Sequence, residues 1–178
     1  MDLNLDTWII SDTHFFHDNI VKYCNRPEDH TERIAKAWRS MILPSDTVLH
    51  LGDLFMGINR NDPNLTFLLA SLTGRKYLIM GNHDRQKERF YSDFGYTVVE
   101  PFTMILSDGL KIRFSHYPEA CINTKADLDW NVDIHGHIHN NGYGSEILVP
   151  GRKYINVSIE ETDYKPIRLK DILKKAGV

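Results

Sequence analysis

The chain of 178 residues contains 42% hydrophobic and 25% charged residues, a composition that predicts a globular protein with a single domain over residues 1–178. No window approaches the ~18 apolar residues of a membrane span, and the first residues lack the features of a secretory signal, so we expect a cytoplasmic protein with no membrane partner. The net charge of −3 argues against tight nonspecific binding of nucleic acids, and Cys24 and Cys121 lack CxxC spacing, which indicates a reducing environment.

Three short apolar runs in the first half predict buried strands. They cover residues 7–10, 47–51 and 76–80, and each ends in glycine or in a small polar residue. Helical patterns separate them, so the order is strand, helix, strand, helix, strand. This order predicts a parallel sheet with helical crossovers.

The two helices between these strands carry start and stop signals. Asp29 and Glu32 resemble a capping box at the start of the first helix, which Pro44 ends. Asp62-Pro63 is a typical N-cap and first-turn pair for the second, whose leucines over residues 65–72 lie on one face. Both helices are therefore expected to pack an apolar face against the sheet.

The second half is rich in predicted strands. A turn at residues 107–109 predicts a hairpin, and residues 169–176 predict a short C-terminal helix. The expected strands cover residues 97–99, 102–106, 110–115, 132–135, 147–149 and 154–157. We therefore expect an α/β fold in which two sheets pack face to face, with helices outside.

Polar residues follow five of the predicted strands, where a fold does not require them. They are Asp12-Thr13-His14, Gly52-Asp53, Gly81-Asn82-His83-Asp84, His116, and Gly136-His137-Ile138-His139. Each group alone is typical of a turn or a cap. Because ligand sites form at the carboxyl ends of strands in α/β sheets, the joint pattern predicts that these groups meet at one rim.

The chemistry of these side chains predicts a metal site. Carboxylate, imidazole and amide ligands suit Mn²⁺, which we expect first, with Fe²⁺, Zn²⁺ and Ni²⁺ as alternatives. No cysteine accompanies them, so a structural thiolate zinc site is not indicated. The seven side chains are too many for one ion, and two ions that share one carboxylate would use them all: Asp12, His14, Asp53, Asn82, His116, His137 and His139.

The same segments, in this order, resemble the calcineurin-like metallophosphoesterase superfamily, whose pattern is D-x-H, G-D, G-N-H-D, H and G-H-x-H. The resemblance implies a four-layer α/β/β/α sandwich. It also implies that one metal takes Asp12, His14, Asp53 and His139, and that the other takes Asp53, Asn82, His116 and His137. Asp53 would bridge the two ions.

The resemblance further implies a mechanism. Two cations roughly 3.5–4 Å apart lower the pKa of a bridging water and clamp the phosphoryl oxygens, so that hydroxide attacks phosphorus in line. His83, which is not a ligand in this pattern, would protonate the leaving oxygen, and Asp84 would orient His83 and favour its protonated form.

Other histidines and basic residues carry weaker signals. His17 and Arg26 are candidates for binding substrate. A helix-start residue is an equally ordinary interpretation of His17, and a surface or ion-pairing residue is the more ordinary interpretation of Arg26. His50 is expected to be a core residue or to support the site, and His30 to be an exposed helix residue. The aromatic residues Phe15, Phe16 and Tyr117 are expected to belong to the core rather than to wall a cleft.

The sequence thus predicts a phosphoesterase, with a phosphodiesterase slightly preferred and a phosphomonoesterase as the alternative. A catalytically inert scaffold of the same family is a second alternative, but inert relatives usually have broken ligand sets. A metal-storage or metal-sensing domain is a third, but it would not need His83 and Asp84. The expected substrate is a phosphate ester, such as a nucleotide or a nucleic-acid end, and no obligate protein partner is indicated.

Overall fold

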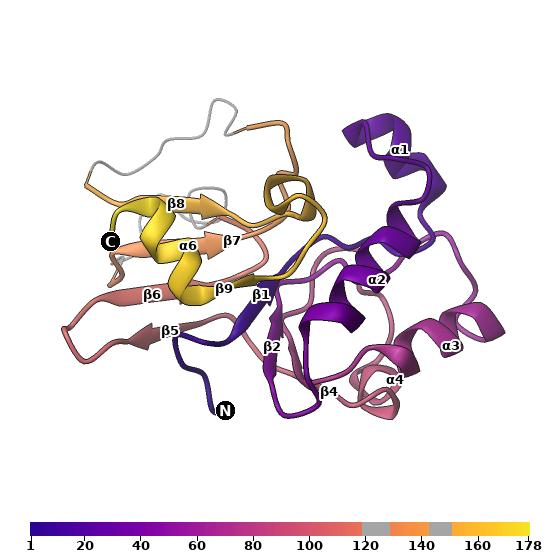
Figure 1. The fold of residues 1–178 in the computed structure, drawn as a ribbon, viewed down its shortest axis with the longest axis horizontal. Coiled ribbons are helices and arrows are strands. Elements are labelled where there is room, and N and C mark those ends of the chain that lie inside the picture. Colours follow the sequence, from indigo (N-terminus) through magenta and orange to yellow (C-terminus); the bar gives the residue numbers. More distant parts are fainter. Residues whose placement is uncertain (119–128, 143–150) are drawn as a thin grey trace.

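The computed structural model describes residues 1–118, 129–142 and 151–178, which form two sheets and several helices (Figure 1). The elements in chain order are β1 (Trp8–Ile10), α1 (Asp18–Cys24), α2 (His30–Met41), β2 (Thr47–His50), α3 (Pro63–Ser71), β3 (Arg75–Leu78), α4 (Glu88–Asp93), β4 (Tyr96–Val98), β5 (Phe102–Ile105), β6 (Lys111–Phe114), β7 (Val132–His135), β8 (Lys153–Asn156), the 3-10 helix η1 (Ile159–Thr162), β9 (Ile167–Arg168) and α6 (Leu169–Ala176).

The first sheet has the strand order β4-β3-β2-β1-β9. Strands β1, β2, β3 and β4 are parallel to their neighbours, and β9 pairs antiparallel with β1. The predicted parallel arrangement of the first three strands is therefore confirmed. Parallel pairing brings the carboxyl ends of these strands to the same edge of the sheet.

The second sheet has the strand order β5-β6-β7-β8. Strands β5 and β6 form the predicted antiparallel hairpin, whose turn is closed by a hydrogen bond from Gly109 N to Leu106 O. Strands β6, β7 and β8 are parallel. The strand expected at residues 147–149 lies outside the described residues.

The alternation of side chains along β1 explains how the layers pack. Trp8 and Ile10 belong to a core that the first sheet shares with α2, α3 and α4, whereas Ile9 belongs to a core between the two sheets. Figure 1 shows these three helices on one side of the first sheet and the second sheet on the other. The α/β class with two facing sheets is thus confirmed, and a helical layer outside the second sheet stays a prediction.

Helix α6 joins the two sheets at one edge. It packs against β8 and β9, and its buried Leu169, Ile172 and Leu173 belong to the core between the sheets. The sequence predicted this helix with its correct bounds. None of the helices in the described part of the chain is long and apolar enough to cross a membrane.

Two details of the predicted helices differ from the structure. Helix α3 begins as expected, with Asp62 accepting a hydrogen bond from Asn64 N, but the capping box of α2 is wrong because the Asp29 side chain makes no capping hydrogen bond. The short helices α1 and α4 were not predicted. They have seven and six residues, too few turns to establish a helical pattern in the sequence.

Candidate metal centre

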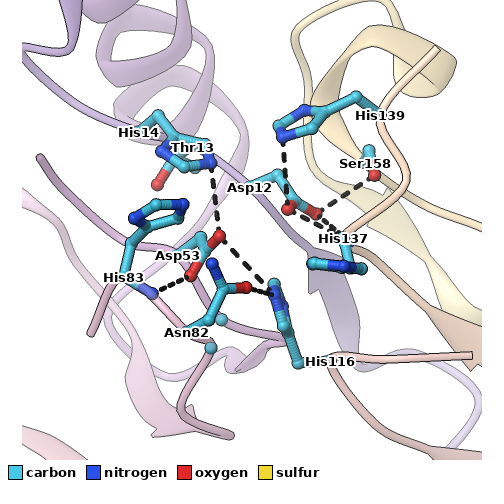
Figure 2. Close-up of polar contacts among 12 residues, drawn as sticks. Asp12, Thr13, His14, Asp53, Asn82, His83, His116, His137, His139 and Ser158 are labelled. Carbon is cyan, nitrogen blue, oxygen red and sulfur yellow. Dashed lines mark hydrogen bonds and ion pairs between the residues drawn. The ribbon is translucent and has the colours of Figure 1, made fainter. Parts of the chain in front are cut away.

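The predicted ligand residues meet where the strands of both sheets end. Asp12, Asp53 and Asn82 follow β1, β2 and β3 of the first sheet, while His116 and His137 follow β6 and β7 of the second. Figure 2 shows the two carboxylates in the middle of a ring of histidines. The structure therefore brings together side chains from segments that lie far apart in the sequence.

Asp53 occupies the centre of this cluster. Its Oδ2 lies 3.4 Å from His14 Nε2 and 3.5 Å from His116 Nε2, and its Oδ1 accepts a hydrogen bond from the backbone N–H of His83 over 2.8 Å (Figure 2). Asn82 Oδ1 lies 3.1 Å from His116 Nε2. This central position is the one that the resemblance implies for a bridging carboxylate.

Asp12 lies beside Asp53, and its carboxylate is bound by the backbone of the loop after β7 in the second sheet. Both of its carboxylate oxygens accept from the backbone N–H of His137, at 3.1 and 3.0 Å, and Oδ1 lies 3.9 Å from His139 Nε2. The ligand atoms of Asp12, His14 and His139 lie within 4.8 Å of one another, as do those of Asp12, Asp53 and His116. The division of the seven residues into two sets of four stays a prediction.

The donor set fits divalent metal ions. Among the described residues, the buried Nδ1 of His14 has no hydrogen-bond partner and its Nε2 has only the 3.4 Å contact with Asp53, an arrangement that is costly unless something else binds the ring. Burial lowers the pKa of His137 and so favours the neutral imidazole that can ligate. Burial alone would raise the pKa of Asp53, but the imidazoles of His14 and His116 outweigh it and lower that pKa, so Asp53 is a carboxylate.

Most of these ligand residues have an unusual backbone conformation. Asp12, His14, Asp53, His137 and His139 have φ values of 55°, 44°, 58°, 71° and 50°, in the left-handed region that side chains other than glycine rarely adopt. Each such residue costs on the order of 1–3 kcal/mol, and residues of this kind cluster at functional sites. The fold thus maintains local strain at the residues that carry the ligands.

His139 and Asp12 depend on residues that the sequence did not identify. His139 Nδ1 lies 3.1 Å from Glu160 Oε1, and Asp12 Oδ2 accepts from the Ser158 hydroxyl over 3.1 Å. Asn156 Nδ2 donates to the carbonyl of His139. Burial alone would lower the pKa of His139, but hydrogen bonds to Cys24 and Glu160 and the charge of Asp12 raise it to about 10.

His50 supports the site from inside the first sheet, as one of its two expected roles. It is fully buried, its Nε2 lies 3.0 Å from the Thr13 hydroxyl, and its Nδ1 accepts from the backbone N–H of Gly52. Burial lowers its pKa to about 3, so it is neutral. His50 therefore stabilises, through Thr13 and Gly52, the turns that carry Asp12 and Asp53.

Asp84 does not have the predicted role of orienting His83. Its carboxylate accepts hydrogen bonds from the backbone N–H groups of Asp53, Leu54 and Gly81, at 2.7, 3.1 and 2.8 Å. His83 Nδ1 has no hydrogen-bond partner among the described residues, and burial lowers the pKa of His83 rather than raising it. Asp84 instead fastens the loop after β3 to the loop after β2.

A pocket of about 380 Å³ opens from the candidate metal ligands. His17 lines it, as does His83, whereas Arg26 does not. A larger pocket lies elsewhere, beside Trp8 and α6, and has no histidine among its lining residues, so we assign the site from the ligand cluster rather than from cavity size.

Arg26 is an ion-pairing residue, which was the more ordinary of its two interpretations, whereas His30 differs from its predicted environment. Arg26 is buried and pairs with Glu160 over 2.8 Å, while its other nitrogens donate to the carbonyls of Asp12 and Thr13. It therefore supports the ligand loop from behind. His30 was expected to be exposed, but it is buried, with Nε2 at 3.4 Å from the carbonyl of His14. The expectation of an exposed His30 was wrong.

Comparison with known proteins agrees with the site. Residues 5–171 match the family model described as calcineurin-like phosphoesterase, so the chain belongs to that family. It is 38% identical over 172 residues to an uncharacterized protein of Methanocaldococcus jannaschii, a match that covers 94% of this chain and 89% of the relative. The Gene 66 protein of Mycobacterium phage L5 is 28% identical over 163 residues, which cover 76% of this chain and 78% of that protein.

A solved structure has the same fold. The crystal structure of a protein of unknown function from Aquifex aeolicus superposes with a TM-score of 0.71 at 27% identity, covering 95% of this chain and 98% of that chain. The family membership predicted from the five sequence segments is thus confirmed.

Proposed function

We propose that the chain is a two-metal phosphoesterase that hydrolyses a phosphate ester, with a phosphodiester as the preferred substrate. The observation that carries this proposal is the convergence of the seven predicted ligands on one cluster, in which Asp12, His14, Asp53 and His116 are buried. His14 Nδ1 has no hydrogen-bond partner among the described residues. The intact set speaks against an inert scaffold. Membership of the calcineurin-like phosphoesterase family supports the same reaction class.

The proposed ligands are the seven side chains already described, with Asp53 shared and Mn²⁺ as the first candidate ion. When bound, two divalent ions supply an acidified water and positive charge beside the phosphoryl oxygens. The chain itself fixes their positions through the hydrogen bonds that Asp12 accepts from His137 and Ser158. His83, which lines the pocket and whose Nδ1 has no hydrogen-bond partner among the described residues, is the proposed donor to the leaving oxygen.

The charge of the pocket supports a diester. Among the described residues that line it, none is a lysine or an arginine. A phosphomonoester carries one more negative charge than a diester near neutral pH, and this pocket offers that charge no cationic side chain. A diester, which presents one charge to the ions and an organic group to the walls, is the better match. A nucleotide or a nucleic-acid end in the cytoplasm is the proposed biological form.

The test compares bis(p-nitrophenyl) phosphate with p-nitrophenyl phosphate. Protein stripped with EDTA and reloaded with Mn²⁺ is expected to hydrolyse the diester faster, and stripped protein to hydrolyse neither. A preference for the monoester would overturn the diester assignment and leave a phosphatase. No turnover of either compound by protein that holds two ions per chain would contradict the proposed function and favour the inert scaffold.

A further inference from the structure

The pocket has a second part that the metal ligands do not account for. Helix α1 and the loop after Asp53 supply a wall on which Ile20, Tyr23 and Met56 face the same space as His14 and His83. Figure 1 shows α1 standing apart from both sheets, on the same side of the molecule as α2. The wall therefore adds apolar and aromatic surface directly beside the proposed reaction centre.

Tyr23 is the unusual member of this wall. It is 70% exposed, whereas Ile20 on the same helix is buried. Its only described ring contact is with His17, at 6.4 Å between ring centroids and an interplanar angle of 68°. This edge-to-face contact leaves most of the tyrosine ring open to a ligand in the pocket.

Given the proposed function, we infer that Tyr23, with Ile20 and Met56, forms a subsite for the ester group that a phosphodiester retains when its leaving group departs, and that the nucleobase of a nucleotide is the biological form of that group. The pocket lining described lacks lysine and arginine, so a second phosphate would find neither of these cations there, whereas a neutral aromatic group would find a stacking surface. Stacking of a base on an aromatic side chain accounts for roughly 5- to 150-fold in affinity.

The test uses two diesters that release the same p-nitrophenolate: thymidine 5′-(p-nitrophenyl) phosphate and methyl p-nitrophenyl phosphate. Tyr23→Ala is expected to lower kcat/KM for the thymidine ester about 5-fold or more, mainly through KM, and to leave the methyl ester unchanged. Tyr23→Phe keeps the ring and should behave as the unsubstituted protein. Phe67→Ala removes a similarly exposed aromatic from α3 and is the matched control.

An equal loss on both esters, or no loss on either, overturns the subsite. If the metal-loaded, unsubstituted protein hydrolyses neither ester, the proposed function fails, and the subsite is then judged by calorimetric binding of the thymidine ester. Weaker binding by Tyr23→Ala than by the unsubstituted protein would still support the subsite, and equal or absent binding would overturn it.

A separate observation concerns His139. Its Nδ1 lies 3.1 Å from Glu160 Oε1, and the same oxygen accepts from Arg26 Nε over 2.8 Å. Because the carboxylate can only accept, this contact requires a proton on His139 Nδ1; Arg26 Nη2, which can only donate, lies farther from that nitrogen, at 3.4 Å. In the neutral form of the ring, to which a metal ion binds, a proton on Nδ1 leaves the lone pair of Nε2 on the side of Asp12.

Arg26 extends this contact to the other ligand. Its Nη2 donates to the carbonyl of Asp12 over 2.6 Å, so one guanidinium links the chain at Asp12 to the carboxylate behind His139. This arrangement fixes the distance between Asp12 of the first sheet and His139 of the second. We propose that Glu160 is a positioning residue for His139, acting on the affinity of the metal ion that His139 binds.

Metal affinity, measured by competition with a chromogenic chelator for Zn²⁺, tests this second proposal. Glu160→Gln is expected to weaken one of the two equivalents about 10- to 100-fold, while Glu161→Gln, at the exposed neighbouring position, should have no effect. In a His139→Ala background, Glu160→Gln should produce no further loss. An unchanged affinity of Glu160→Gln, or an equal loss in both backgrounds, overturns the proposal, and so does the absence of metal binding by the unsubstituted protein.

Discussion

The carboxylate of Asp84 accepts a hydrogen bond from the backbone N–H of Asp53 over 2.7 Å and so determines where the central ligand of the cluster lies. It also accepts from the N–H groups of Leu54 and Gly81, which makes it a buried junction of two loops. Burial raises the pKa of Asp84. Asp84 therefore has a structural role in the candidate metal centre, which its position in the G-N-H-D pattern does not indicate.

Asp84→Asn should test this role. The amide has one acceptor oxygen in place of two and would direct an NH₂ group at a backbone N–H, so we expect a loss of about 1–3 kcal/mol in the free energy of unfolding and weaker metal binding. Chemical denaturation of the metal-free protein measures the first effect. Asp93→Asn, at an exposed position at the end of α4, is the control, and equal stability of the two variants would contradict the role.

The roles of His83 and Asp53 predict different defects. His83→Ala should lower kcat by about 10²- to 10⁴-fold, the contribution of a general acid, and leave metal content near normal. Asp53→Ala should abolish activity and lower metal content, because two ions share this carboxylate in the proposed site. Elemental analysis with kinetics measures both, and equal metal loss in the two variants would rule out the assignment of His83.

Gly136 should tolerate no side chain. An added Cβ would lie 2.0 Å from Ser11 Oγ and 2.2 Å from Asp12 Oδ2, so Gly136→Ala must displace a ligand carboxylate. We expect this variant to lose metal affinity and to have a lower thermal midpoint in metal-loaded buffer. If it instead binds both ions as tightly as the unsubstituted protein, the packing of this turn on Asp12 does not control the site.

Lys76, which lies outside the candidate metal centre, should make the stability of the fold depend on pH. Burial lowers the pKa of its ammonium to about 8, although the group donates to the carbonyl of Leu72 over 2.7 Å. The unfolded chain holds this proton more tightly, so the free energy of unfolding should rise from pH 8 to 10 relative to Lys76→Met, by about 1–3 kcal/mol. Denaturation in EDTA measures it; Lys36→Met, at an exposed position of α2, is the control. A constant difference would contradict the low pKa.

Much of the site was predictable because short sequence patterns carry it. Asp12, Asp53 and Asn82 each follow an apolar run by one to a few residues, and parallel pairing of β1, β2 and β3 then brings them together. An apolar run followed by a polar residue thus predicts both a strand and the site residue that follows it. The same logic placed His116 and His137 at the ends of β6 and β7.

Other features depend on contacts that no local pattern records. Glu160 lies in a short 3-10 helix that reads as a polar loop, and Arg26 reaches it from 134 residues away. His30 sits on a helix with an amphipathic pattern, but the ligand loop covers it and buries it. In both cases the burial comes from the packing of a loop on distant elements, and a helical or strand period carries no information about such packing.

The ligands are divided between the two sheets, since Asp12, His14, Asp53 and Asn82 follow strands of the first sheet while His116, His137 and His139 follow strands of the second. Ions bound there would act as a cross-link between two halves whose other main contact is an apolar interface. We therefore expect bound metal to slow the separation of the sheets, so that chelation shortens the lifetime of the folded chain as well as stopping catalysis. Metal supply would then set both the activity of the protein and its persistence.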